Sequence, residues 1–133
     1  FLADMKSKLE DGMVCYAECG GFMYLARSIT TLENETYGMC GFFDVNCTMT
    51  KRLRRVGYIT INYDGLRFGA HEFHRSNMSG GQLDYGYAIE KNRDGKLTNE
   101  WECGAKQENV LAGYPHVHFY AEPQFARKVF NND

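Results

Sequence analysis

Positive charge is not in excess in this 133-residue chain, which holds fifteen lysines and arginines against seventeen acidic residues. A formal net charge of -2 leaves no electrostatic footprint for DNA, RNA or an anionic lipid surface, so neither nucleic acid nor a membrane is an expected partner. Apolar runs long enough to span a bilayer are absent, as is a basic flank followed by an apolar signal segment. We therefore expect a soluble, cytoplasmic protein.

Disulfide and metal frameworks are also missing. The five cysteines are odd in number and follow no paired spacing, which favours reduced thiols over a secreted disulfide scaffold. The sequence has no C-x-x-C, no H-E-x-x-H and no G-x-x-x-x-G-K-[ST] phosphate loop, and we find no internal repeat or linker. What is present is a hydrophobic content of 44%, which suits one small globular domain or a piece of a larger one.

The alternation of apolar segments and chain breakers predicts an α/β unit with a strongly β middle. Helices are expected over 2–11, with Gly12 as terminator, over 20–30, and over 121–132 with Pro123 near its start. Residues 13–17 (MVCYA) lack polar alternation and are expected to form a strand buried on both faces of a parallel sheet. Further strands are expected over 37–48, 55–63, 66–74, 82–91, 99–104 and 109–120, with a hairpin turn at 92–96.

Cys19 lies where the first strand should turn into the second helix, in the sequence AECGG (17–21). Small residues two positions before and after a nucleophile allow the chain to reverse sharply and expose the side chain. The sulfur would then lie at a helix N-terminus that favours thiolate, with the N–H of Gly20 able to donate to an oxyanion. The alternative is a small buried hydrophobe in a glycine turn. Such core roles are expected for Cys15, Cys40, Cys47 and Cys103.

The four histidines fall into two pairs. His116 and His118 are two residues apart on an expected strand and would share a face, so either could serve as general base for Cys19. Metal binding competes with this interpretation, because H-x-H together with a third histidine can hold zinc. His71 and His74 are expected either to be structural or to contribute to substrate binding.

Four sequence blocks carry a resemblance to a known family: YAECGGFMYL (16–25), MTKRLRRVGY (49–58), GAHEFHRS (69–76) and AGYPHVHFYAEP (112–123). In this order, from about Gly12 to Phe125, they resemble the glutamine amidotransferase domain of the cobyrinic acid a,c-diamide synthases. The resemblance implies a type 1 glutamine amidotransferase with a flavodoxin-like open α/β sheet. Because only eighteen residues precede Cys19, it also implies that residues 1–133 are the C-terminal portion of that domain, incomplete at its N-terminal side.

The resemblance also assigns site residues. It implies that Cys19 is the nucleophile of a glutaminase and that His116 activates it. Many other type 1 amidotransferases have a glutamate two residues after that histidine; here the position is His118, which fits a Cys-His dyad and leaves the orienting partner of His116 unidentified. Pro115 departs from the aliphatic residue expected there and could alter strand pairing. Contacts with the glutamine substrate are implied for Gly20, Glu72 and His74.

The implied reaction is hydrolysis of glutamine through a thioester on Cys19. The ammonia would pass to a second site, where ATP has activated a carboxylate, and would amidate the a and c carboxylates of cobyrinic acid. Mg²⁺ and ATP are implied in a separate N-terminal synthetase domain, and no cofactor is expected in this chain. The implied partners are glutamine and, through the synthetase domain, the corrinoid, while self-association stays open.

Three alternatives also stay open. The acceptor could be another tetrapyrrole, as in a Ni-sirohydrochlorin a,c-diamide synthase, because the glutaminase part does not determine which acceptor is used. The chain could instead be a non-catalytic fragment or interaction module. Finally, the basic cluster over 51–55 could face the synthetase domain or the corrinoid, or could be a solvated surface. That cluster consists of Lys51, Arg52, Arg54 and Arg55.

Overall fold

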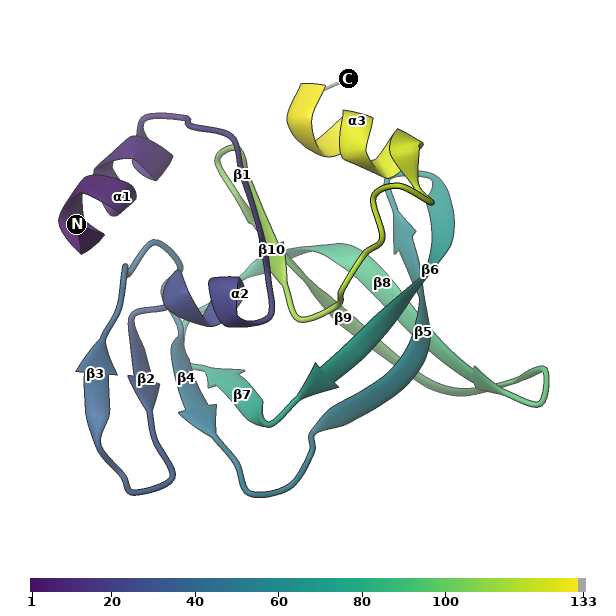
Figure 1. Cartoon of the computed structure of the whole chain (residues 1–133), viewed down its shortest axis with the longest axis horizontal. Helices are drawn as coiled ribbons and strands as arrows, with labels where there is room; N and C mark the ends of the chain where they lie inside the picture. The colour runs from purple at the N-terminus through teal and green to yellow at the C-terminus, as the bar shows by residue number, and fades with distance from the viewer. Residues whose placement is uncertain (132–133) are drawn as a thin grey trace.

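The computed structural model describes residues 1–131, which form a mixed α/β unit in which strands dominate and helices are short (Figure 1). The α/β class with its β-rich middle is thereby confirmed. None of the helices in this part of the chain is long and apolar enough to cross a bilayer. In chain order the elements are α1 (Leu2–Glu10), β1 (Cys15–Glu18), α2 (Gly20–Tyr24), β2 (Ser28–Thr30), β3 (Thr36–Gly38), β4 (Asn46–Met49), β5 (Arg55–Tyr63), β6 (Leu66–His74), β7 (Ser76–Ser79), β8 (Asp84–Arg93), β9 (Lys96–Gln107), β10 (Val110–Gly113) and α3 (Pro123–Asn131).

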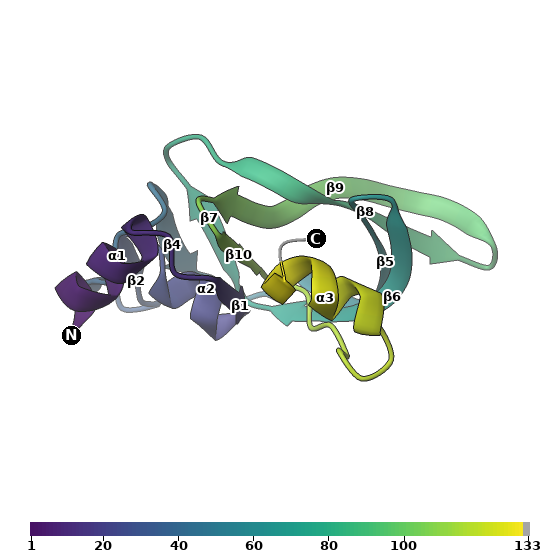
Figure 2. The ribbon, with the colours of Figure 1, turned by 90° about the horizontal axis from the view of Figure 1, so that it is seen from above.

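The larger sheet has six strands in the order β1-β10-β9-β8-β5-β6. β1 and β10 run parallel, with Glu18 opposite Gly113, and the other neighbours are antiparallel. The long strands twist, and the sheet curls until β6 approaches the chain that leaves β10 (Figure 2). There His71 and His116 exchange two backbone hydrogen bonds, with N–O distances of 3.1 and 2.7 Å. The opposite sides of an open sheet therefore meet at one point.

The smaller sheet has four strands in the order β3-β2-β4-β7. β7 follows β6 after a single residue, Arg75, and pairs with β4, so the two sheets are joined through the chain itself. Phe22 of α2 links them by packing, because its ring meets those of Phe43 and Tyr114 at centroid distances of 5.9 and 5.4 Å. The short helix α2 is thus fixed from both sides.

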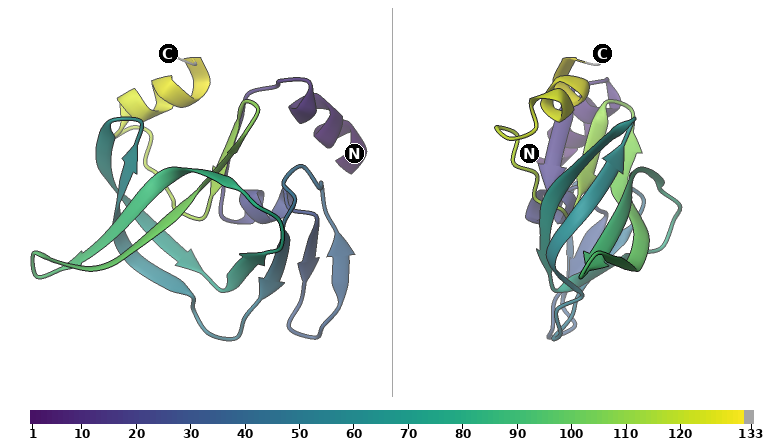
Figure 3. Two further views of the ribbon diagram at one scale, coloured as in Figure 1. Left: turned by 180° about the vertical axis from the view of Figure 1, so that it is seen from behind. Right: turned by 90° about the vertical axis from the view of Figure 1, so that its right-hand side faces the viewer.

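α3 covers the inner side of the curled sheet (Figure 2), while the β8–β9 hairpin extends away from it (Figure 3). Phe125, fully buried, anchors the helix. Its ring lies 4.9 Å from Phe68 and 5.3 Å from Tyr63, and 5.9 Å from Tyr16 of β1. One aromatic side chain from the C-terminal helix therefore ties together strands from both sides of the sheet.

Several expected elements are confirmed. The first helix matches α1 to within one residue, and the bounds of β5 and β6 are those expected. The predicted hairpin turn contains Asp94 and Gly95, both with positive φ (53° and 77°), as a two-residue turn between twisted strands requires. The last helix contains Pro123 as its first residue; residue 132, the end of the expected helix, lies outside the described residues.

Other expectations were wrong in their extent. The helix over 20–30 ends at Tyr24, because Leu25 and Ala26 reach the core from a loop and the chain then enters β2. The strand over 37–48 is interrupted by a buried loop between β3 and β4. The strand over 109–120 ends at Gly113, just before Pro115, which lacks an N–H for strand pairing.

The expectation for the first strand was half right. β1 pairs in parallel, as predicted for residues 13–17, but the strand is Cys15–Glu18 and it lies at the edge of the sheet. All four of its residues are only partly buried, so it is not covered on both faces. The apolar run in the sequence could not distinguish an edge strand from a central one.

Replacement of Phe125 with alanine should test whether α3 holds the curl together. Phe125→Ala is expected to lower the free energy of unfolding by about 3–5 kcal/mol, because it leaves a cavity among five aromatic rings. Tyr120→Ala is the matched control, since Tyr120 is 93% exposed, and should change stability by less than about 0.5 kcal/mol. Denaturant unfolding measures both, and equal effects would contradict the anchoring role.

Candidate active site

Cys19 occupies a strained turn between β1 and α2. Its φ of 52° and ψ of -105° lie in a region that residues with a side chain rarely adopt. The turn is held by two backbone hydrogen bonds, from the Cys19 N–H to the Gly113 carbonyl (2.7 Å) and from the Met23 N–H to the Cys19 carbonyl (3.1 Å). A Cβ atom at Gly21 would lie 3.1 Å from that of Ala17, which explains the small residues on either side. The predicted strand, sharp turn and helix are all present.

The Cys19 thiol is partly buried, with its sulfur 3.8 Å from the carbonyl oxygen of Phe73 in β6. Burial raises the pKa of this thiol, and the nearby Glu18 and Glu72 carboxylates act in the same direction, whereas the Gly20 N–H hydrogen bond lowers it. The helix that follows has only five residues. Any stabilisation of the thiolate by the helix terminus is therefore outweighed. The pKa of Cys19 is raised overall, which favours the thiol. A base is needed to make the sulfur a nucleophile.

His116 lies three residues beyond β10, at the point where the chain meets β6. Its imidazole is 45% exposed, and Nδ1 is 3.6 Å from Oε1 of Glu18. The other oxygen of Glu18 accepts hydrogen bonds from the Tyr16 hydroxyl (2.6 Å) and from the Val117 N–H (2.7 Å). Sequence reasoning missed this carboxylate, because its only signal was its place directly before Cys19.

His118 does not share a strand with His116, since β10 ends at Gly113. The premise that placed both histidines on one face was therefore wrong. The exposed ring of His118 instead accepts a hydrogen bond at Nδ1 from the Ala121 N–H (3.3 Å), in the turn that leads to α3. Of the two, His116 is the one next to a fixed carboxylate.

Glu72 and His74 point to the inner side of β6 and are 1% and 8% exposed. The His74 ring stacks on Tyr114, with centroids 3.6 Å apart and planes 9° from parallel, and its Nδ1 is 3.0 Å from the Ser76 carbonyl oxygen. Its Nε2 is 3.5 Å from Oε1 of Glu72. Within the described part of the chain, Oε2 of Glu72 and Nε2 of His74 have no hydrogen-bond partner. His71 on the same strand is exposed.

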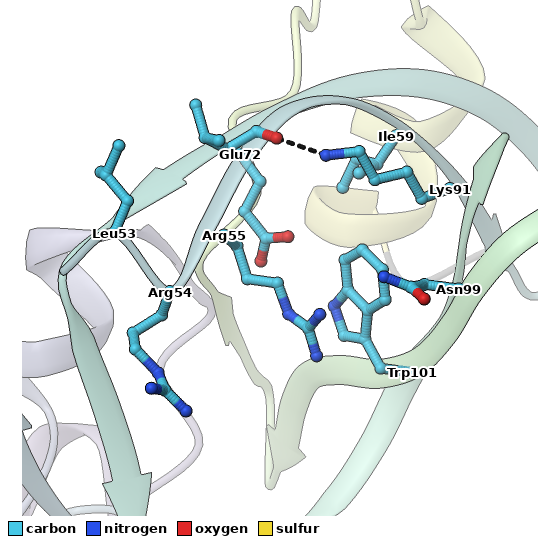
Figure 4. Close-up of a pocket in the computed structure, with 9 residues that line it drawn as sticks. Leu53, Arg54, Arg55, Ile59, Glu72, Lys91, Asn99 and Trp101 are labelled. Atoms are coloured by element: carbon cyan, nitrogen blue, oxygen red, sulfur yellow. Dashed lines mark hydrogen bonds between the residues drawn. The ribbon is translucent and has the colours of Figure 1, made fainter. Parts of the chain in front are cut away.

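Glu72 lines two neighbouring cavities, of about 150 and 230 Å³. Figure 4 shows the smaller one, in which the Arg55 guanidinium lies against Trp101, 3.9 Å from its ring centroid. His74 and Tyr114 line the larger one. A buried carboxylate with an unpaired oxygen thus lines two partly open cavities, where a small cationic ligand could pair with it.

The basic cluster over 51–55 divides in two. Arg55 is partly buried and lines both cavities, whereas the other three residues are exposed in the loop between β4 and β5. Arg54 is tethered there, since its Nε donates to Oδ1 of Asn77 at 3.1 Å. The exposed members are Lys51, Arg52 and Arg54.

The structure gathers most of the predicted site residues around β6. Cys19 contacts the carbonyl of Phe73, and His116 pairs through its backbone with His71. Glu72 and His74 lie at the same end of β6, on the buried face opposite to the side chains of His71 and Phe73. Across residues 1–131, no three His, Cys, Asp or Glu side chains gather closely enough to hold a metal ion, so the zinc alternative finds no site in that range.

Comparison with known proteins gives a consistent family. The sequence model of the CobB/CobQ-like glutamine amidotransferase domain matches residues 1–124. Relatives named cobyrinate a,c-diamide synthase are 41% identical over 127 residues in Caldanaerobacter subterraneus subsp. tengcongensis, 37% over 134 residues in Clostridium acetobutylicum and 38% over 130 residues in Fusobacterium nucleatum.

These alignments cover 90–95% of this chain but only 27–29% of the three relatives, so the chain spans less than a third of their length. The family match and the strand-turn-helix geometry at Cys19 agree with the resemblance seen in the sequence. The chain belongs to the CobB/CobQ-like glutamine amidotransferase domain family.

Proposed function

We propose that this chain is the glutaminase portion of an ATP-dependent amidoligase of cobalamin biosynthesis, in which it hydrolyses glutamine and supplies ammonia. The observation that carries the proposal is the strained turn that presents Cys19 beside the segment bearing His116, in a member of a glutamine amidotransferase family. The names of the relatives support the acceptor: ammonia would convert the a and c carboxylates of cobyrinic acid to amides.

The proposed chemistry uses Cys19 and His116 as nucleophile and base. Nε2 of His116 takes the thiol proton as the sulfur attacks the amide carbon of glutamine. The same proton is then given to the leaving nitrogen, ammonia departs, and a thioester remains on Cys19. Water, deprotonated by the same imidazole, attacks the thioester and releases glutamate with the thiol restored. The net change is glutamine and water to glutamate and ammonia.

The negative oxygen of each tetrahedral intermediate needs hydrogen-bond donors. The Gly20 N–H lies at the start of α2, directly after Cys19, where it lowers the pKa of the thiol, and it is the donor that this chain supplies in the proposal. Gly20 itself has no steric need to be glycine, since a Cβ there would meet no atom within 4 Å. The role proposed for it therefore belongs to its backbone rather than to its missing side chain.

Glu72 and His74 are proposed to bind the glutamine. Glu72 lines the cavities beside the end of β6, and its Oε2 has no donor among the described residues. A buried carboxylate of this kind is suited to the ammonium group of an amino acid. His74 is fixed by stacking on Tyr114, and its Nε2 lies 3.5 Å from the other oxygen of Glu72.

ATP and Mg²⁺ are assigned in this proposal to a synthetase domain outside the chain. The 133 residues contain no phosphate-binding loop, and the relatives are more than three times as long as the matched part. The exposed Lys51, Arg52 and Arg54 are candidates for contact with that domain or with the carboxylates of the corrinoid.

Replacement of Cys19 tests the proposed function. Cys19→Ser should lower glutamate release from glutamine at least about 1,000-fold, because serine is not deprotonated by a neighbouring imidazole as readily as a thiol is. In a full-length synthase carrying this chain, amidation with free ammonia should persist. Cys15→Ser, four residues away on β1, is the matched control and should keep glutaminase activity.

The measurement is an enzymatic glutamate assay, with peptide mapping after treatment with a glutamine-like diazoketone. Labelling is expected at Cys19. Loss of both glutamine- and ammonia-dependent amidation in Cys19→Ser would contradict the proposed division of labour, as would labelling at a different cysteine.

A second prediction concerns Glu72. Glu72→Gln should raise the KM for glutamine about 10- to 100-fold, because a charged hydrogen bond to the substrate ammonium is lost, and should leave kcat within a few-fold. Glu100→Gln is the control, because Glu100 is exposed and lies on β9, three strands away from β6 in the sheet. Steady-state kinetics over a range of glutamine concentrations separates the two constants, and an unchanged KM would remove Glu72 from the binding site.

A further inference from the structure

We infer that Glu18 is the positioning residue of His116: its carboxylate accepts the Nδ1 proton of the imidazole, which leaves Nε2 free to take the proton of Cys19. The inference rests on the proposed function of His116 and extends it by a third group. It places the carboxylate of the site directly before the nucleophile in sequence.

The geometry of the carboxylate carries this inference. Oε2 of Glu18 is held by two donors, the Tyr16 hydroxyl at 2.6 Å and the Val117 N–H at 2.7 Å. With that oxygen occupied, Oε1 is left facing Nδ1 of His116 at 3.6 Å. The Glu18 side chain is only 26% exposed to solvent, so the carboxylate is largely buried and is held in place through Oε2.

The backbone explains why a residue of β1 can reach this histidine. Glu18 is opposite Gly113 in the parallel pair of β1 and β10, and the chain bends after Gly113. The bend returns Val117 to the carboxylate, and the neighbouring His116 is held from the other side by its backbone pair with His71. β6 therefore holds the backbone of His116, while Glu18 lies next to its imidazole.

The position of Glu18 has an electrostatic cost that the inference accounts for. A carboxylate next to Cys19 is one of the causes that raise the pKa of the thiol, and so works against the nucleophile. If Glu18 acts through His116, its net effect on the nucleophile becomes favourable. A carboxylate that stabilises an imidazolium favours transfer of the thiol proton to the ring. If Glu18 served only to accept the hydrogen bond of the Val117 N–H, a neutral acceptor at this position would be sufficient.

Substitution by glutamine separates these roles. In Glu18→Gln the amide oxygen can keep both the Tyr16 and the Val117 hydrogen bonds, so the amide nitrogen would face Nδ1 of His116. The amide nitrogen is a donor, so Nδ1 of His116 would have to accept and the imidazole proton would lie on Nε2. A protonated Nε2 cannot accept the thiol proton of Cys19. We expect kcat for glutamate release to fall at least about 100-fold, with KM for glutamine little changed.

Glu35→Gln is a matched control, because Glu35 accepts a hydrogen bond from Tyr37, two residues away, at the same 2.6 Å but lies in the β2–β3 turn. It should keep full activity. Both variants and the unchanged protein are assayed in the full-length synthase that carries this chain. Wild-type activity in Glu18→Gln would overturn the inference and leave the proposed function standing; absence of glutaminase activity in the unchanged protein would overturn the proposed function.

Nitrogen NMR of the labelled imidazole tests the inference without turnover. At a pH where His116 is neutral, the unchanged protein should carry the proton on Nδ1, and Glu18→Gln should shift it to Nε2. The resonance is assigned by its loss in His116→Gln. A neutral ring protonated at Nε2 in the unchanged protein, or a tautomer that is the same in both proteins, would overturn the role of Glu18.

Discussion

The parallel pairing of β1 with β10 is the constraint on which the candidate site depends. These strands are about ninety residues apart in the chain, yet their register places Glu18 opposite Gly113 and the Cys19 N–H on the Gly113 carbonyl. The curl of the sheet then brings β6 to the same point, where it contacts the sulfur through Phe73 and the histidine segment through His71. A site is formed where three strands converge, none of which carries it alone.

The turn at Cys19 is retained at a cost. A non-glycine residue with φ of 52° and ψ of -105° stores roughly 1–3 kcal/mol of backbone strain, which the surrounding structure must offset. The hydrogen bond to Gly113 fixes the turn on its strand side, and the packing of Phe22 against Phe43 and Tyr114 fixes the helix side. Strain of this kind is found mainly where it presents a functional side chain, which is consistent with the chemistry proposed for the sulfur.

Local features of the fold could be predicted from the sequence, and long-range ones could not. β5, β6 and the turn at Asp94 were located correctly because alternation and turn chemistry are local. The extent of α2 was misjudged because the apolar run after Tyr24 fits a buried loop as well as a helix. At the site, Cys19 was recognisable from its neighbours. Glu18 was not, because Val117 and His116, which lie next to its carboxylate, come from a distant segment that only the three-dimensional fold brings to β1.

The placement of a carboxylate directly before the proposed nucleophile, Cys19, affects how the groups of the candidate site are positioned relative to one another. When a carboxylate and a histidine come from one segment, the nucleophile must be positioned against both by tertiary packing. Here Glu18 and Cys19 share a strand end, so their separation is set by the backbone, and only the histidine segment has to be placed. That segment is fixed by the His71 backbone pair and by the Val117 N–H bond to Glu18 itself. The carboxylate inferred to orient the imidazole therefore also anchors the chain segment that carries His116, through its hydrogen bond with the Val117 N–H.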